Sequence, residues 1–230
     1  MQPPPAPLTL CERVTADKTR SRDVLHALCS FHAISDNPHS IMIALVAWIM
    51  MLELATPLSP FAARKLCHAG CGLGIMLLDS TDYGSRLFVW TVAFGSIAMT
   101  WNLSPLPAFR FSREKDVGIT VYLLLVSAWF WLQLPAPMLA PLFFADPAGA
   151  VVGKTLSRKF GPRWNPPWCG PKTVAGSCAV FLLTYLTIAY ECTVLQRAGL
   201  AAAATVAEAV GGDYDNLAIA AVVLVGWWCV

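Results

Sequence analysis

Four carboxylates interrupt apolar stretches of this 230-residue sequence: Glu53, Asp146, Glu191 and Glu208. A charge near the centre of a lipid bilayer is costly, so an acid inside an apolar segment marks a candidate functional site. Glu53 and Glu191 lie near the ends of their segments, where their side chains can reach water. Asp146 lies deep within its segment, and carboxylate oxygens are ligands that Mg²⁺ prefers. Asp146 is therefore the first candidate for metal-dependent chemistry.

The residues after Asp146 predict an interrupted helix. Pro147 removes a backbone donor, and Gly149 and Gly153 loosen a helix. Such a break is tolerated in a membrane where the backbone lines a cavity or a site. We expect a long basic loop over residues 154–172 and a new helix that begins near Lys172.

This segment, residues 146–177, has the residue types of a phosphate-binding site. Glycine-rich turns expose backbone N–H groups, and a helix N-terminus carries partial positive charge. Lys154 and Lys172 add positive charge. An acid that faces this segment would hold Mg²⁺ on bound phosphates. The alternative interpretation is a basic cytoplasmic loop whose glycines serve helix packing.

The elements that must position these residues are apolar helices. The sequence is 57% hydrophobic and 13% charged, against about 25% charged residues in an ordinary soluble domain. We predict an all-α, polytopic membrane helix bundle with seven or eight transmembrane helices. Its apolar segments are 41–58, 66–78, 87–103, 117–134, 136–153, 174–195, 198–210 and 216–230.

The loops between these segments carry their positive charge on one side. If every segment crosses, ten Lys and Arg residues fall on one side, and Arg86 and Arg197 on the other. The positive-inside rule then places the basic side in the cytoplasm or its organelle equivalent. Residues 1–40 form a polar N-terminal tail that could be a targeting segment, and residues 41–230 form the membrane domain. The net charge of +2 gives no indication of a nucleic-acid partner.

The eight cysteines show no paired spacing that predicts a disulfide framework. Cys67, His68 and Cys71 form a C-H-x-x-C group, but a fourth ligand at a suitable spacing is missing. A zinc site is therefore not predicted there. The glycines at 70, 72 and 74 are expected to allow close helix packing.

Five short motifs in order resemble the signature of the polyprenol kinase family, which includes phytol, farnesol and dolichol kinases. CTP-dependent diacylglycerol kinases share it, and the family is related to phosphatidate cytidylyltransferases. The matching stretches cover residues 61–220. They are Arg64-Lys65-Leu66-Cys67-His68, Ser112-Arg113-Glu114-Lys115-Asp116 ahead of Tyr122, Asp146 through Gly153-Lys154 with Phe160-Gly161, Lys172-Thr173-Val174-Ala175-Gly176-Ser177, and Glu208 with Asp215-Asn216-Leu217.

The sequence departs from the family pattern at three places. Thr173 replaces the usual Ser but keeps the hydroxyl, and Lys154 replaces an Arg and loses its bidentate fork. The Gly-Pro-Leu-Tyr-Tyr stretch of phytol kinases is reduced to residues 119–122. These differences bear on the identity of the substrate more than on the class of reaction.

The resemblance implies transfer of the γ-phosphate of CTP, or of ATP, to the hydroxyl of a lipid alcohol, with Mg²⁺ as cofactor. It implies that Asp146 and Asp215 bind the metal. The implied catalytic residues are Asp146, Lys172, Glu208, Asp215, Asn216, Arg113, Glu114 and His68. The residues implied to bind the nucleotide are Gly153, Lys154, Gly161, Lys172, Thr173, Ala175 and Gly176.

The partners implied are a lipid alcohol, a nucleotide and membrane lipids, in a plastid membrane or the endoplasmic reticulum. The sequence leaves open which alcohol is used and the oligomeric state. Two other functions remain: a phosphatidate cytidylyltransferase-like CDP-lipid synthase, and a non-enzymatic ion-coupled transporter whose intramembrane acids bind ions. The late K-D, H-G-G and D-R-x-D stretch of the cytidylyltransferases is not found.

Overall fold

The computed structural model describes residues 37–229, which form eight α-helices, two short 3-10 helices and one two-stranded antiparallel sheet. The all-α prediction is thereby confirmed, and each predicted apolar segment corresponds to one α-helix. The predicted N-terminal tail lies outside the described residues, apart from residues 37–40. The elements are α3 (Pro38–Leu54), α4 (Pro60–Met76), α5 (Tyr83–Thr100), α6 (Val117–Trp131), η2 (Ala136–Leu139), α7 (Ala140–Phe160), β1 (Pro167–Cys169), β2 (Lys172–Thr173), α8 (Val174–Thr187), α9 (Val194–Gly211), η3 (Gly212–Tyr214) and α10 (Asp215–Cys229).

Side-chain caps determine where most of these helices begin. Each capping side chain accepts a hydrogen bond from a backbone N–H of the first turn, which has no partner within the helix. α3 and α4 also carry proline in their first turn, where its missing N–H costs nothing. The capping residues are Asn37, Ser59, Asp82, Asp116, Thr173 and Thr193.

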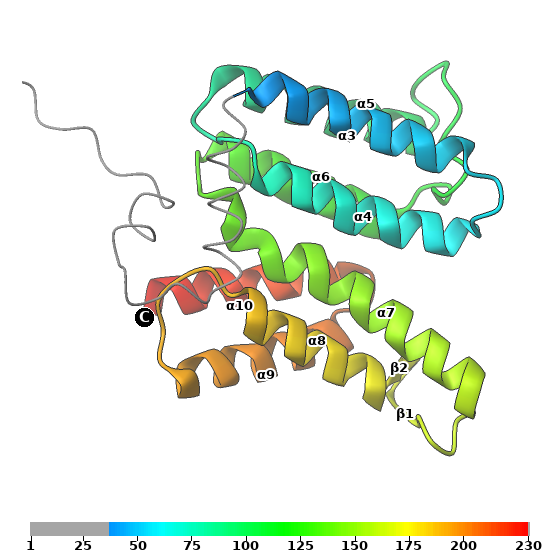
Figure 1. Ribbon diagram of the computed structural model, residues 1–230, viewed down its shortest axis with the longest axis vertical. Helices are drawn as coiled ribbons and strands as arrows, with labels where there is room; N and C mark the ends of the chain where they lie inside the picture. The colour runs from blue at the N-terminus through cyan, green and yellow to red at the C-terminus, as the bar shows by residue number, and fades with distance from the viewer. Residues whose placement is uncertain (1–36, 230) are drawn as a thin grey trace, which may run out of the picture.

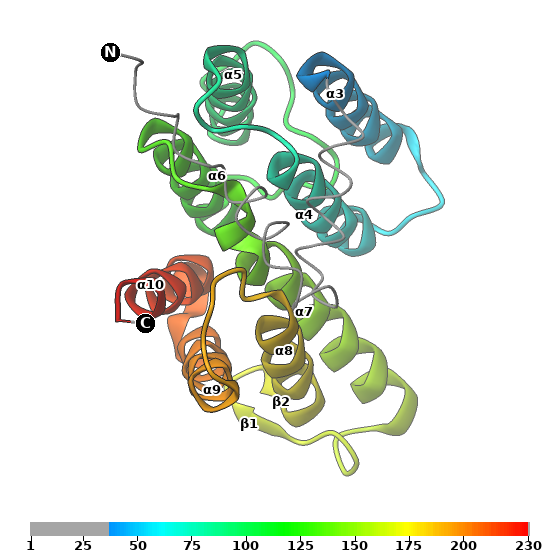
Figure 2. The ribbon, with the colours of Figure 1, turned by 60° about the vertical axis from the view of Figure 1, so that its left-hand side comes forward.

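The helices form two groups that meet at α7. α3, α4, α5 and α6 make one group, and α8, α9 and α10 make the other (Figures 1 and 2). α7 packs against α4 on one side and against α8 and α10 on the other. The loop between α5 and α6 and the β1–β2 hairpin lie at the same end of the bundle in Figure 1. A residue of α7 therefore faces side chains from both groups.

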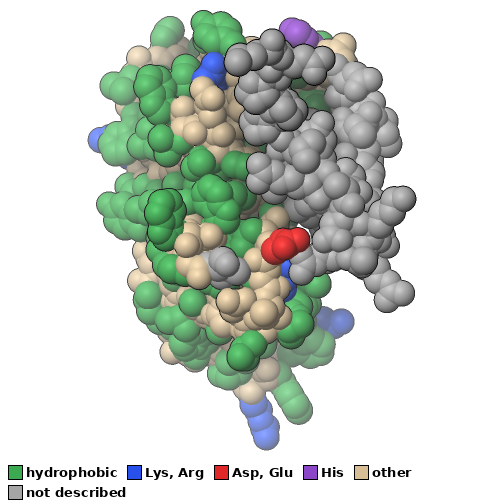
Figure 3. Space-filling model, turned by 90° about the vertical axis from the view of Figure 1, so that its left-hand side faces the viewer, with side chains coloured by type: hydrophobic (Ala, Val, Ile, Leu, Met, Phe, Trp, Pro, Cys, Tyr) green, Lys and Arg blue, Asp and Glu red, His purple; other side chains and the backbone are tan. Residues whose placement is uncertain are grey.

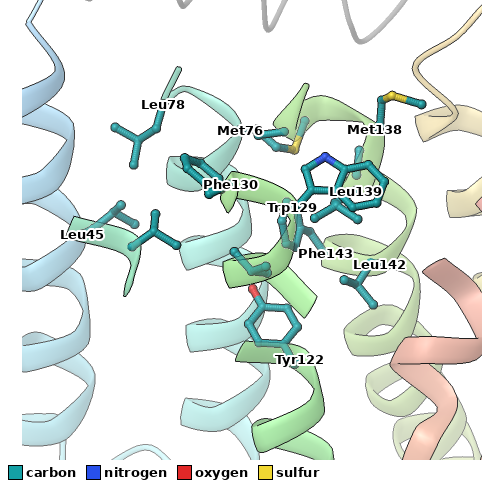
Figure 4. Close-up of a cluster of buried hydrophobic side chains, with 14 of the residues drawn as sticks. Leu45, Met76, Leu78, Tyr122, Trp129, Phe130, Met138, Leu139, Leu142 and Phe143 are labelled. Atoms are coloured by element: carbon teal, nitrogen blue, oxygen red, sulfur yellow. The ribbon is translucent and has the colours of Figure 1, made fainter. Parts of the chain in front are cut away.

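The apolar core fills the opposite end of the bundle. The last turns of α4 and α6 pack there against η2 and the start of α7 (Figure 4). Phe130, Leu139, Leu142 and Phe143 are at most 1% exposed. The expected packing role of the α4 glycines is confirmed at Gly72, because the side chain of Phe143 occupies the space that a Cβ atom would need.

The prediction that the helix breaks after Asp146 is wrong, because α7 continues through Pro147 to Phe160. Residues 154–160, expected to belong to a basic loop, are therefore helical. A proline inside a helix leaves preceding carbonyls to be satisfied by other groups. The carbonyl that Pro147 leaves without a helical donor is that of Phe143. One residue earlier, the Leu142 carbonyl oxygen accepts a hydrogen bond from His68 Nε2 of α4 at 3.2 Å. Packing of α7 against its neighbours thus outweighs the local effect of the proline.

Two segments of the described chain are long and apolar enough to cross a membrane by length and composition: Ala136–Phe160 and Val194–Cys229. The second is bent at η3, since α9 and α10 pack against each other. Large hydrophobic side chains are also exposed on most helices, and Figure 3 shows them spread over one face with few charges between them. The number of seven or eight spans remains a prediction.

Arg110, in the loop between α5 and α6, holds the end of α3. Its guanidinium donates to the carbonyl oxygens of Leu52, Glu53, Ala55 and Leu58 at 2.7–3.1 Å. The Glu53 carboxylate accepts from the backbone N–H of Arg110 at 3.0 Å. These carbonyls lack helical partners, and a positive charge at a helix C-terminus is favourable. Glu53 therefore has a structural role in this clamp.

Replacement of Arg110 by Met should lower the free energy of unfolding by about 3 kcal/mol or more, since one charged donor contributes about 1.5–3 kcal/mol and several are lost. The free energy of unfolding of Arg110→Lys should lie between that of the unmodified protein and that of Arg110→Met, because one ammonium cannot reach all four carbonyls. Thermal unfolding in detergent measures the effect, with the exposed Arg163→Met as control. Equal stability of the Arg110 and Arg163 variants would contradict the clamp.

Candidate functional site

Three carboxylates from three helices converge at one place in the structure. Asp146 of α7, Glu208 of α9 and Asp215 of α10 each place an oxygen within 4.8 Å of the other two. Asp146 is 6% exposed and Glu208 is 3% exposed. Like charges at this spacing repel one another strongly away from water. Neighbouring positive charges relieve this repulsion.

Two lysines supply positive charge to this acidic cluster. Lys172 of β2 contacts Glu208 and lies 3.1 Å from Asp215 Oδ2. Lys65 of α4 lies 2.7 Å from Asp146 Oδ2. Two ammonium groups against three carboxylates leave one net negative charge. Burial by itself lowers the pKa of Lys172, but its hydrogen bonds and attraction to the two acids raise that pKa above the ordinary value. Lys172 therefore stays charged at neutral pH.

His68 approaches the cluster from α4. Its Nδ1 lies 3.6 Å from Asp146 Oδ2, which is too long for a direct hydrogen bond. Because Nε2 donates to the Leu142 carbonyl, Nδ1 is the nitrogen that faces the carboxylate. The imidazole ring also packs on Tyr122, with ring centroids 4.3 Å apart. These contacts orient His68 toward Asp146.

The acidic cluster fits a small, hard divalent cation. Mg²⁺ takes six oxygens at about 2.0–2.1 Å, so two of its ligands lie at most about 4.2 Å apart. Adjacent ligands on such an ion lie only about 3 Å apart, so the three carboxylates, whose oxygens lie within 4.8 Å of one another, would draw closer around a shared ion. Their residual negative charge also favours a cation. Asp146 and Asp215, the predicted metal ligands, both belong to this cluster.

Asn165 ties the connection between α7 and α8 to both helices. Its Nδ2 donates to the Gly153 carbonyl oxygen at 3.1 Å and to Ser157 Oγ at 2.9 Å. Its Oδ1 accepts from the backbone N–H of Ala175 at 2.9 Å. Lys172 lies within this connection, so the three hydrogen bonds of Asn165 help to position Lys172 in the cluster.

The N-terminus of α8 is already capped by the protein itself. The backbone N–H of Val174 donates to the Pro166 carbonyl, that of Ala175 to Asn165, and that of Gly176 to Thr173 Oγ1. These groups were expected to bind phosphate. Since they have partners, the positive charge available to an anion comes from lysine side chains.

The glycines of this region bring α7 and α8 into close contact. A Cβ atom on Gly176 would lie 2.8 Å from the Gly149 carbonyl oxygen, and one on Gly153 would lie 2.9 Å from Thr173 Oγ1. Gly161 has a φ of +76° and follows the last residue of α7. Helix packing and helix termination thus account for these glycines.

One cavity of about 720 Å³ connects the acidic cluster to an apolar region. Its polar end is lined by the cluster, by Lys65 and by Lys172, and its apolar end lies among α3, α4, α5 and α6. Two buried oxygens of lining residues, Tyr122 Oη and Asn216 Oδ1, have no hydrogen-bond partner among residues 37–229. An unpaired buried polar atom costs about 1–3 kcal/mol, which a polar ligand group would offset.

The predicted site residues separate into two sets. The lining of the cavity includes Asp146, Lys172, Glu208, Asp215, Asn216, Arg113, His68, Gly153, Lys154, Thr173 and Gly176. The other predicted residues, Glu114, Gly161 and Ala175, are not among the lining residues. Glu114 is exposed and accepts from Asn102 Nδ2 at 3.4 Å. The ammonium of Lys154 lies over the Phe61 ring, 3.9 Å from its centroid.

Two residues of the site were missed by the sequence analysis, Lys65 and Asn165. Helix spacing could have predicted Lys65, because it lies three residues before His68 and shares its helix face. Asn165 stands alone in a turn rich in proline and tryptophan, which carries no signal for its three contacts.

Comparisons with protein-family models, curated proteins and solved structures find no match for this chain.

Loss of the Asn165 amide should loosen the α7–α8 connection. Each hydrogen bond contributes about 0.5–1.5 kcal/mol, so Asn165→Ala should lower the free energy of unfolding by about 2–4 kcal/mol. Hydrogen exchange at Ala175 N–H should accelerate, because this group loses its acceptor. Unchanged exchange at Ala175 in a folded variant would contradict the anchoring role.

Divalent-cation binding tests the acidic cluster directly. Mn²⁺, followed by its paramagnetic resonance signal, should bind the protein and be displaced by Mg²⁺. Asp215→Asn should weaken binding at least about tenfold, because one ligand charge is lost. Asp79→Asn is the control, since Asp79 is exposed and lies in the turn between α4 and α5, outside the cavity lining. Equal weakening in both variants would argue for a general charge effect.

Proposed function

We propose that this chain is an integral membrane lipid-alcohol kinase with seven or eight transmembrane helices. It would transfer the γ-phosphate of a nucleotide, CTP by family resemblance, to the hydroxyl of an isoprenoid alcohol such as phytol, farnesol, geranylgeraniol or dolichol. The loops that carry ten Lys and Arg residues would face the cytoplasm or its organelle equivalent. The membrane would be a plastid membrane or the endoplasmic reticulum.

The observation that carries this proposal is the single cavity with a charged end and an apolar end. A lipid alcohol has the same two parts: one hydroxyl that reacts and a long apolar tail. The charged end offers carboxylates for a metal and lysines for phosphates. An ion-coupled transporter would explain the buried acids, but it gives no reason for an apolar compartment beside them.

Asp146 and Asp215 would hold Mg²⁺, and the bound metal would neutralise charge on the β- and γ-phosphates. Lys172 and Lys65 already lie at these carboxylates and would contact phosphate oxygens as point charges. The raised pKa of Lys172 suits this role, because the group stays an ammonium and is a donor at neutral pH. Asn216 would add a side-chain amide beside Asp215.

Glu208 would act as the general base. In the reaction, the alcohol oxygen forms a bond to the γ-phosphorus, the bond to the bridging β–γ oxygen breaks, and the alcohol proton passes to the Glu208 carboxylate. Glu208 is buried and lines the polar end of the cavity, where its carboxylate would face the alcohol hydroxyl. Lys172, which contacts Glu208, would keep this carboxylate oriented.

The apolar tail would lie within the α3–α6 group. The apolar lining there includes Leu45, Ile49, Phe88, Val92 and Leu123. These side chains offer no hydrogen-bonding groups, so they favour hydrocarbon over water. Tyr122, with its unpaired hydroxyl, lines the same cavity and packs on His68, which faces the acidic cluster. The reacting alcohol would thus lie near His68 and Tyr122.

The test is phosphate transfer by detergent-purified protein. γ-Labelled CTP or ATP would be supplied with Mg²⁺ and a panel of phytol, farnesol, dolichol and diacylglycerol. Label should appear in a lipid alcohol, and Asp146→Asn should reduce the rate at least about a hundredfold, because a metal ligand is lost. Asp79→Asn, in the turn between α4 and α5 and outside the cavity lining, is the matched control.

Absence of label in every lipid, from folded protein that still binds Mn²⁺, would refute the kinase proposal. Formation of CDP-lipid from phosphatidate and CTP would instead assign the site to nucleotidyl transfer. Loss of activity in Asp79→Asn equal to that in Asp146→Asn would show that the assay reports instability.

A further inference from the structure

Cys67 and Cys71 form a pair of thiols that the proposed reaction does not use. They lie one helical turn apart on α4, line the cavity, and place their Sγ atoms 3.8 Å apart. Both are free cysteines. Because residues i and i+4 share one face of a helix, the backbone of α4 holds the two sulfurs side by side.

The distance between the sulfurs matches that of a metal-bound pair. A tetrahedral Zn²⁺ binds thiolate sulfur at about 2.3 Å, so two sulfurs on one such ion lie about 3.8 Å apart. The observed separation is 3.8 Å, so both thiols could bind one ion with little movement of the helix. Helix spacing thus provides a bidentate arrangement before any ion arrives.

Charge balance also favours a divalent ion at this place. Binding releases one proton from each thiol, and two thiolates with one dication carry no net charge. A neutral group is tolerated at a buried position where a lone charge is not. Tyr122 lines the same cavity as the two thiols, and its hydroxyl has no hydrogen-bond partner among the described residues. The cavity therefore also offers an unpaired oxygen.

We propose that Cys67 and Cys71 form a binding site for a thiophilic divalent cation of the Zn²⁺ and Cd²⁺ type. Cys67 precedes His68, which faces the acidic cluster, and Cys71 packs against the apolar core. The site therefore lies between the charged and apolar ends of the cavity, and a bound ion narrows the passage between them. The proposal does not depend on the proposed function, because binding needs neither nucleotide nor lipid.

The experiment is a Cd²⁺ titration followed by the ultraviolet thiolate-to-cadmium charge-transfer band. The protein carries Ser at the exposed Cys178 and Cys229 and at Cys11 and Cys29, and the buffer holds a large excess of Mg²⁺ to occupy the carboxylates. Hard oxygen ligands retain Mg²⁺, whereas sulfur selects the softer ion. One Cd²⁺ per chain should bind, and C67S or C71S should weaken binding at least tenfold.

Cys169→Ser is the matched control, because this thiol donates to the Ala209 carbonyl and lies on β1. Binding that is equal in C67S, C71S and the parent protein would overturn the proposal. So would a folded parent protein that gives no charge-transfer band. Mn²⁺ binding by the same variants in Mg²⁺-free buffer shows that the acidic cluster is intact, so failure of the thiol site is distinguishable from failure of the carboxylate site.

Discussion

The structure depends on how three carboxylates are kept together inside a mostly apolar bundle. Asp146, Glu208 and Asp215 come from three different helices and lie within 4.8 Å of one another, and ion pairs with lysine relieve their mutual repulsion. Lys65 joins α4 to Asp146 of α7, and Lys172 joins the hairpin to Glu208 of α9 and Asp215 of α10. Removing one lysine would leave an uncompensated buried charge. The site and the fold are therefore stabilised by the same contacts.

The sequence predicted the helices well because apolar segments bounded by polar residues are a strong signal. The sequence also predicted that Asp146, Lys172, Glu208 and Asp215 are site residues. The structure places all four side chains in one cluster. The effect of Pro147 was misjudged, since local propensity was outweighed by tertiary packing of α7. Contacts such as those of Asn165 depend on how loops fold back on helices, and short-range sequence patterns do not encode them.

The capped N-terminus of α8 changes the expected mode of phosphate binding. A cradle of backbone N–H groups fixes an anion by geometry, whereas lysine ammonium groups act as mobile point charges on flexible side chains. Here Asn165 and Thr173 occupy the backbone donors, and Lys172 and Lys65 carry the charge. A phosphate site of this kind, as the proposed function requires, would recognise charge more than shape. A metal held by rigid helices would then supply the geometric precision that the lysines lack.

The cavity explains why the α3–α6 group needs support at both of its ends. A space of about 720 Å³ forgoes the dispersion contacts that close packing would provide. The apolar core around Phe130 and Phe143 closes one end, and the Arg110 clamp on α3 holds the other. Between these two ends lies the cavity in which the proposed hydrocarbon tail would bind. Rigid ends and an open middle are what a bundle needs if an apolar tail is to enter without unfolding it.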